Sequence, residues 1–150
     1  MQYQIRTARP ADEAIIRALF LEMLRTIYGK EEVEGYRAGY LDRYWTGSEE
    51  RIYLAEDQDV VAFLSVEIHR EERDFIYLDD LSVTAAYRNQ GIGSALIRQA
   101  EAYGKEIQIS PVIFHVEKTN RAALRLYQRL GYAIWRDEER RYLMKKDIFP

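Results

Sequence analysis

The stretch Leu78-Asp79-Asp80-Leu81-Ser82-Val83, followed after three residues by Tyr87-Arg88-Asn89-Gln90-Gly91-Ile92-Gly93-Ser94, decides how this sequence is interpreted. A strand with two acidic residues leads into a turn with the spacing R-x-x-G-x-G, and a helical pattern begins directly after it. A glycine-rich turn that opens a helix leaves backbone N–H groups unpaired, and the helix dipole adds partial positive charge. Such a turn binds phosphate groups, and Arg88 adds a fixed charge beside it.

The same turn excludes two other phosphate-binding motifs. It lacks the lysine of a P-loop, and Leu96 stands where a dinucleotide fingerprint needs a third small residue. A nucleotide-binding oxidoreductase is therefore disfavoured. Because the pattern is short, a turn that uses glycine only for its geometry remains the alternative interpretation.

Hydrophobic spacing around this stretch predicts elements in the order β-α-α-β-β-β-α-β-α-β-β. The expected strands cover residues 3–8, 51–56, 60–69, 75–83, 112–116, 133–135 and 141–145, and the expected helices cover residues 10–29, 31–45, 91–105 and 120–130. We expect a mostly antiparallel, twisted sheet with helices on both faces, an α/β class in composition. The length of 150 residues predicts a single domain, residues 1–150.

Three tyrosines mark the expected helix over residues 31–45. Tyr36, Tyr40 and Tyr44 recur at intervals of four, which stacks side chains on one helix face. Packing against the core and lining of a substrate pocket are both open interpretations of this stripe.

Composition narrows the classes of partner. A formal net charge of -3 provides no basic field for nucleic acid. The sequence has no cysteine and only two histidines, which argues against a disulfide framework, thiol catalysis and a metal site. It shows no signal peptide and no apolar run of about 18 residues, so we expect a cytoplasmic protein without a membrane partner. A homodimer is left open.

Residues 78–132 resemble the GNAT superfamily of acyl-CoA-dependent N-acetyltransferases in three successive places. These are the strand Leu78 to Val83, the turn from Arg88 to Gly93, and Asn120-x-x-Ala123-x-x-Leu126-Tyr127-x-x-Leu130-Gly131-Tyr132. The acidic pair before the turn is similar to that of the spermidine/spermine N-acetyltransferase branch. The resemblance implies a GNAT-like fold and acetyl-CoA as cosubstrate, without a metal.

The resemblance also implies roles for individual residues. Leu81, Ser82 and Val83 would offer backbone groups to the pantetheine arm, and Asn120 would bond that arm or the neighbouring strand. Tyr127 would lie near the thioester sulfur. The diphosphate would be held by Asn89, Gln90, Gly91, Ile92, Gly93 and Ser94, beside Arg88.

Acetyl transfer needs a neutral amine, a polarised carbonyl and a proton for the departing thiolate. Tyr127 suits the role of acid, because a phenol has a reference pKa of about 10, close to that of a thiol leaving group. The alternative is that Tyr127 is a packed core aromatic residue.

Asp79 and Asp80 are the candidate bases, since acidic residues inside an apolar strand are costly unless they face water or a partner. Successive strand residues point to opposite faces, so only one would reach a given cleft unless a bulge shifts the phase between Leu78 and Leu81. The resemblance favours Asp79, acting through a water molecule or by attracting an ammonium group. A rim salt bridge is the alternative interpretation, and we expect His115 to be packed or solvated rather than a second base.

The predicted function is transfer of an acetyl group from acetyl-CoA to a primary amine of a small molecule or peptide, by direct attack in a ternary complex. The alternative is a non-catalytic domain of the same fold that senses acyl-CoA or binds a partner. No pattern in the sequence identifies the acceptor.

Overall fold

Seven strands form one sheet in the computed structural model, which describes residues 2–149. The strand order is β1-β2-β3-β4-β5-β7-β6. The described strands are β1 (Gln4–Thr7), β2 (Arg51–Asp57), β3 (Asp59–His69), β4 (Phe75–Val83), β5 (Val112–Glu117), β6 (Ala133–Glu138) and β7 (Arg141–Lys146). β4 and β5 are parallel, whereas β1–β2, β2–β3, β5–β7 and β6–β7 are antiparallel. The predicted strands and the mixed, mostly antiparallel sheet are therefore confirmed.

Three α-helices are described, α1 (Glu13–Tyr28), α2 (Ile92–Ile107) and α3 (Arg121–Arg129). Short 3-10 turns, η1 (Pro10–Asp12), η2 (Tyr40–Tyr44) and η3 (Ala85–Tyr87), lie between the longer elements. η1 begins at Pro10 and leads directly into α1, as expected for a residue whose fixed φ suits a first helical turn. Among residues 2–149, no helix has both the length and the hydropathy needed to cross a bilayer.

The predicted second helix over residues 31–45 is wrong. The chain there is irregular, and only the five residues of η2 are helical. Gly39 has a φ of +79°, outside the helical region. At Gly35 an added Cβ would lie 3.0 Å from the Leu21 side chain of α1. The glycines therefore favour an irregular segment pressed against α1.

Tyr36, Tyr40 and Tyr44 all pack against the hydrophobic core, as one of the two interpretations expected, but they do not share one helix face. Tyr36 stacks on Phe20 of α1, with ring centroids 3.8 Å apart, and on Tyr40, at 4.8 Å. Tyr44 instead lies in the buried core with Leu41 and Ile52. The aromatic stack is therefore built from α1 and the following segment rather than along one helix face.

Contacts divide the chain into two compact units, and the boundaries between them fall within β3, β4 and α2. The first unit holds the described chain up to Val66 together with Asp80–Ala100. In this unit the Ser82 hydroxyl donates to the carbonyl of Leu19 in α1 at 3.1 Å. Leu81, the preceding residue of β4, lies against Gly93 of α2. Because adjacent strand residues face opposite ways, α1 and α2 cover opposite faces of β4, which confirms helices on both faces.

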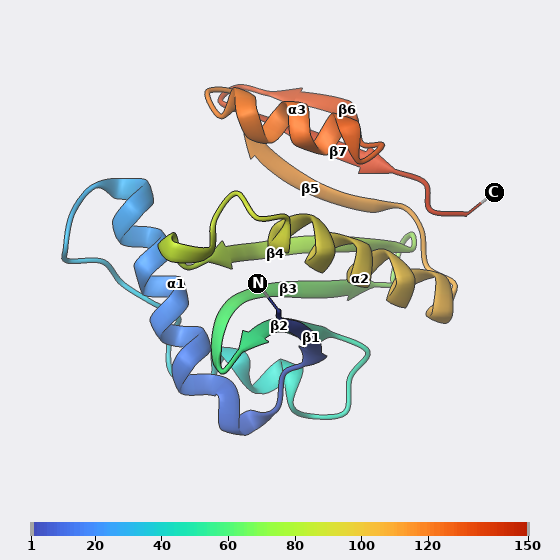
Figure 1. Ribbon diagram of the computed structural model, residues 1–150. Coiled ribbons are helices and arrows are strands. Elements are labelled where there is room, and N and C mark those ends of the chain that lie inside the picture. Colours follow the sequence, from blue (N-terminus) through green and yellow to red (C-terminus); the bar gives the residue numbers. More distant parts are fainter. Residues whose placement is uncertain (1, 150) are drawn as a thin grey trace. The chain divides into compact units, whose positions relative to one another are not determined.

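The second unit holds Glu67–Asp79 and the chain from Glu101 onward. Its α3 lies along β5 and β7 (Figure 1). Phe114 of β5 contacts the rings of Tyr127 and Tyr132, at centroid distances of 4.6 and 4.8 Å. The Tyr132 hydroxyl donates to Glu101 at 2.7 Å, and Lys146 pairs with the same carboxylate at 3.1 Å. These contacts fix the end of α3 against the sheet.

Candidate functional site

The turn between β4 and α2 forms an open cradle of backbone groups. Asn89 and Gly91 have φ of +61° and +82°, and α2 begins at Ile92. The first hydrogen bond of the helix runs from the N–H of Ala95 to the carbonyl of Gly91 at 3.0 Å. The N–H groups that precede it have no carbonyl within the helix to bind. A Cβ on Gly91 would meet no atom within 4 Å, so the space beside these amides fits an anionic group such as a diphosphate.

Arg88 is bound to the protein beside this cradle. Its Nε donates to the carbonyl of Val83 at 2.9 Å, and its Nη2 lies 3.5 Å from Glu22 Oε2. The same carboxylate accepts hydrogen bonds from the Thr84 hydroxyl at 2.8 Å and from the Ala85 N–H at 3.1 Å. Glu22 therefore holds the segment that leads into the turn and offsets the charge of Arg88. Sequence reasoning missed Glu22, because nothing local to α1 indicates a partner more than sixty residues away.

The strand before the turn can offer backbone rather than side-chain groups. Ser82 is buried with its hydroxyl bound to α1. Leu81 faces α2, and the carbonyl of Val83 already accepts from Arg88. A carbonyl has two lone pairs, so that contact leaves one acceptor site on Val83.

The alternation of β4 is interrupted between Ile76 and Leu81. An added Cβ on Gly104 of α2 would lie 2.6 Å from Ile76, and one on Gly93 would lie 3.6 Å from Leu81. The two glycines are eleven residues apart, which is about three helical turns, so they share one side of α2. Ile76 and Leu81 therefore both face α2 although they are five positions apart, an odd number that puts residues on opposite faces of a regular strand.

The two acidic residues are placed by different contacts. Counted from Ile76, Asp79 faces away from the part of α2 at Gly104, and counted from Leu81, Asp80 faces away from the part at Gly93. A bulge makes this possible, and the N–H of Asp80 accordingly binds the side-chain hydroxyl of Ser65 at 2.9 Å.

The surroundings of the two carboxylates differ. Asp80 accepts a 2.6 Å hydrogen bond from the hydroxyl of Tyr36, whose ring is held in the aromatic stack on α1. Asp79 is exposed. Tyr36 belongs to the tyrosine stripe, for which lining of a substrate pocket was one open interpretation, but its contact with Asp80 was not predicted.

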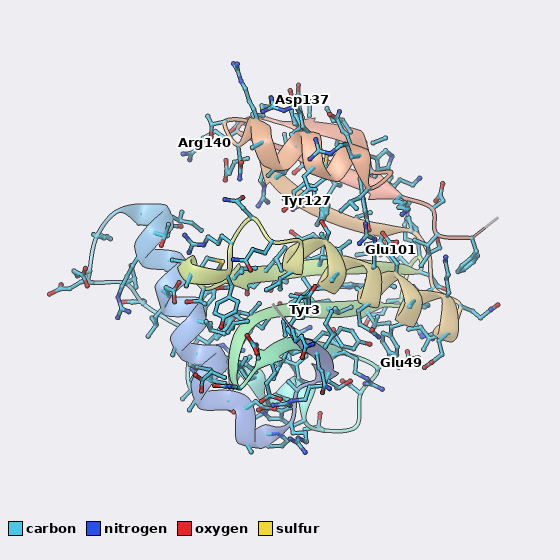
Figure 2. All side chains as sticks on the ribbon, in the orientation of Figure 1. Tyr3, Glu49, Glu101, Tyr127, Asp137 and Arg140 are labelled. Carbon is cyan, nitrogen blue, oxygen red and sulfur yellow. The ribbon has the colours of Figure 1, made fainter. Side chains whose placement is uncertain are left out.

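Tyr127 is half-buried in the second unit, on the side of α3 that faces β5 (Figure 2). Burial raises the pKa of its phenol above the ordinary value. Within residues 2–149 no hydrogen-bond partner is found for its hydroxyl. Tyr132, by contrast, is 2% exposed and bound to Glu101, which together with burial raises its pKa strongly. The Tyr132 hydroxyl is thus used in a buried hydrogen bond, whereas that of Tyr127 has no such bond among the described residues.

Asn120 occupies the N-cap of α3. Its Oδ1 accepts a hydrogen bond from the N–H of Ala123 at 3.2 Å, the usual role of asparagine at this position. The side-chain N–H₂ group is not used by this cap.

The predicted residues fall into two groups. The first unit brings together Asp80, the backbone of residues 81–83 and the turn from Arg88 to Ser94, and the second unit holds Asp79, Asn120 and Tyr127. Across the described chain, no three His, Cys, Asp or Glu side chains are grouped so that they could hold a metal ion.

Comparison with known proteins supports one family. Residues 18–132 match the acetyltransferase (GNAT) family. Mycothiol acetyltransferase of Corynebacterium glutamicum is 30% identical over 90 residues, which is 60% of this chain and 30% of that protein. The chain thus spans under a third of the length of this relative.

Solved structures show the same fold over nearly the whole chain. An acetyltransferase of the GNAT family from Streptococcus pneumoniae superposes with a TM-score of 0.81 and 23% identity, covering 99% of this chain and 100% of that one. The PaiA N-acetyltransferase of Thermoplasma acidophilum, solved in complex with coenzyme A, gives a TM-score of 0.78 and 16% identity, covering 98% and 99%. Since the family match spans most of the chain, this protein belongs to the acetyltransferase (GNAT) family.

Proposed function

We propose that this protein is an N-acetyltransferase that moves the acetyl group of acetyl-CoA to an amine. The observation that carries the proposal is the open cradle at Gly91, where unpaired amides at the start of α2 suit the diphosphate of coenzyme A. Family membership supports it, as does the coenzyme A bound to the related PaiA fold.

The cofactor is assigned mainly to backbone groups. The N–H groups of residues 89–94 would bind the diphosphate, and the backbone of Leu81, Ser82 and Val83 would bind the pantetheine arm. We assign Arg88 to support of the turn together with Glu22, since its guanidinium contacts the Val83 carbonyl and the Glu22 carboxylate. The N–H₂ group of Asn120 is a further donor for the pantetheine arm.

The chemical step follows from the side chains. The amine nitrogen attacks the thioester carbonyl in a ternary complex, a C–N bond forms, and the C–S bond then breaks. Tyr127 would donate its phenolic proton to the leaving sulfur, a role supported by a hydroxyl without a partner among the described residues. Asp79, exposed on the face away from α2, would attract the cationic acceptor, while Asp80 holds Tyr36 in place.

Acetyl-CoA binding and thiol release test this function together. At 100 times its dissociation constant, acetyl-CoA adds about 2.7 kcal/mol to stability and raises the melting temperature by several degrees. Gly91→Asp should abolish this shift, because a carboxylate would occupy the cradle and repel the diphosphate. An unchanged shift in that variant would exclude the cradle as the cofactor site.

An amine panel then separates an enzyme from a sensor. We expect release of free coenzyme A with at least one primary amine, measured by thiol reagent, and none without an acceptor. A protein that binds acetyl-CoA but releases thiol with no amine would be the non-catalytic alternative. In the same assay Asp79→Asn should raise the KM for the amine and leave the acetyl-CoA shift intact.

A further inference from the structure

A cavity of about 510 Å³ opens on one face of the sheet in the second unit. Every residue that lines it belongs to this unit, so the cavity is internal to it. Its floor is apolar and is formed by Phe75 of β4, Ile113 of β5 and Leu143 of β7. Ile113 is adjacent to Phe114, which contacts Tyr127 of α3, so the cavity opens on the face opposite α3. Its volume is typical of pockets that hold a small ligand.

The wall on the β6 side is built by a β-bulge. The register of β6 against β7 shifts between Ile134 and Arg136, and Trp135 stands between them without a register partner. Adjacent strand residues normally point to opposite faces, yet Trp135 and Arg136 both line the cavity. Bulges re-aim side chains in this way and are frequent beside functional sites. The bulge therefore places an aromatic ring and a cation on the same wall.

Two cations lie against the ring of Trp135. The guanidinium carbon of Arg136 is 4.6 Å from the ring centroid, and the ammonium nitrogen of Lys145 is 4.7 Å from it. Among residues 2–149, neither cation forms an ion pair with a carboxylate. The ring thus orients two positive charges that no acidic side chain of the described chain neutralises. This wall, the basic wall of the cavity, suits an anionic group.

The opposite wall is acidic. It is the turn between β3 and β4, which contributes three carboxylates and one guanidinium, those of Glu71, Glu72, Asp74 and Arg73. All four residues are exposed, and in the described part of the chain none of them has a hydrogen bond or an ion pair. The two walls therefore carry opposite charge across an apolar floor. A ligand that matches both has an ammonium group at one end and a carboxylate at the other.

The strand order sets the distance between the walls. The acidic turn leads into β4, and β4, β5, β7 and β6 are neighbours in that order. Two strand spacings therefore separate β4 from Lys145, and three separate it from Arg136, which places the walls roughly 10–14 Å apart. A free amino acid carries both charges on one carbon and cannot reach both walls, whereas three extended residues span about 10 Å. Nucleotides and other polyanions are disfavoured because the acidic turn would repel them.

We propose that this cavity binds a short apolar peptide through both of its charged termini, at a site separate from that of the acetyl acceptor. The N-terminal ammonium group lies at the acidic turn, the C-terminal carboxylate lies at Arg136 and Lys145, and the apolar side chains cover the floor. Asp79, which the proposed function assigns to the acceptor, is four residues beyond Phe75, about 13 Å further along β4. Binding at this site requires neither acetyl-CoA nor a reaction.

Calorimetric titration without acetyl-CoA tests the site with three peptides, trileucine, its C-terminal amide and its N-acetyl derivative. We expect trileucine to bind and each blocked peptide to bind about tenfold more weakly, because each has lost one of the two charge contacts. Free leucine should bind more weakly than any of the three. Absence of trileucine binding, or equal binding of the three peptides, would overturn the proposal.

Variants of the two walls show which terminus each wall meets. Arg136→Gln combined with Lys145→Gln should bind trileucine and its amide equally, because the carboxylate has lost its partners. A triple variant of the acidic turn, Glu71→Gln, Glu72→Gln and Asp74→Asn, should instead bind trileucine and its N-acetyl derivative equally. A preference for free termini that survives in both variants would overturn the assignment of the walls.

Arg129→Gln is the matched control. Arg129 is an exposed arginine of α3 in the same unit, and it does not line the cavity. This variant should bind all three peptides as the wild type does. The comparison of free and blocked peptides on the wild type needs no variant, so a variant that fails to fold leaves the test intact.

Competition separates this site from the acceptor site. In the thiol-release assay with the best amine of the panel, saturating trileucine should leave the KM for that amine unchanged and should not itself be acetylated. Competitive inhibition, or acetylation of trileucine, would place the peptide in the acceptor site and overturn the separate site. A protein that acetylates no amine would overturn the proposed function alone, because the titrations decide the peptide site without acetyl-CoA.

Discussion

The two units offer different kinds of chemical group. In the first unit the turn before α2 presents backbone amides to open space, and Arg88 beside it is bound to Glu22. In the second unit the backbone is paired within strands and α3, and the group that we propose for chemistry is the side chain of Tyr127. A backbone site is damaged by adding atoms, whereas a side-chain site is damaged by removing a single group.

The largest effect on the side-chain part should come from Tyr127→Phe. Loss of the hydroxyl should lower kcat by about 10²- to 10⁴-fold if proton donation to sulfur limits the reaction. The ring contact with Phe114 remains, so the melting temperature and the acetyl-CoA shift should change little. Because burial raises the pKa of Tyr127, the wild-type phenol keeps its proton through neutral pH, and any alkaline limb due to this residue should lie above its usual pH of about 10.

Tyr132→Phe is the matched control for this prediction. It removes the 2.7 Å hydrogen bond to Glu101 from a residue that is almost fully buried. It should therefore lower the melting temperature while the kcat of the folded protein is retained. The opposite pattern, with stability lost in Tyr127→Phe and rate lost in Tyr132→Phe, would exchange the roles that we assign to the two tyrosines.

Two glycines of α2 give the next largest effect. At Gly104 an added Cβ would lie 2.6 Å from Ile76, 2.7 Å from Ile148 and 3.3 Å from the carbonyl of Ile109. The strain of overpacking, about 1–3 kcal/mol, should exceed the gain of about 1 kcal/mol in helix propensity. Gly104→Ala should therefore lower the free energy of unfolding by up to about 2 kcal/mol, measured by urea denaturation.

Gly93→Ala in the same helix should behave differently. Its Cβ would meet only Leu81, at an ordinary contact distance of 3.6 Å, so the stability of the free protein should be unchanged or higher. Because this Cβ faces Leu81 of β4 and leaves the space beside Gly91 open, the acetyl-CoA melting shift should also change little. Equal losses of stability in the two variants would remove the distinction between a crowded glycine and one with room for a methyl group.

The sequence predicted local features better than the contacts between distant segments. The strand, turn and helix from residues 75 to 105 follow from hydrophobic spacing and glycine chemistry, and the structure places them as expected. The predicted helix over residues 31–45 is wrong because Gly35 and Gly39 determine the backbone conformation there. The periodicity that predicted the helix depends only on the tyrosines.

Long-range partners explain the remaining differences at the site. The sequence indicated that the alternation of side chains along β4 could be interrupted. The position of the interruption depends on packing against α2. His115 was expected to be packed or solvated, and its alternation correctly separates it from Phe114. Its hydrogen bonds to Tyr77 of β4 and Glu138 of β6 could not be predicted, since they require the register of β5 and β7 and the order in which β6 joins the sheet.

The smallest effect should come from Glu22→Gln, which asks whether the backbone site depends on any side chain. Glutamine keeps the size of Glu22 and one acceptor oxygen, but it loses the ion pair with Arg88 and weakens the contacts to Thr84 and Ala85. The turn then loses support worth about one hydrogen bond, roughly 1 kcal/mol. We expect acetyl-CoA to bind about three- to tenfold more weakly in a calorimetric titration. Glu32→Gln, the same change at an exposed residue of the first unit, is the control and should bind normally. A double-mutant cycle with Arg88→Gln should give a coupling of at least about 0.5 kcal/mol if the two residues act as one support. Tighter binding by Glu22→Gln would contradict this role, because it would mean that Glu22 withholds Arg88 from the diphosphate and that the turn needs a cationic side chain after all.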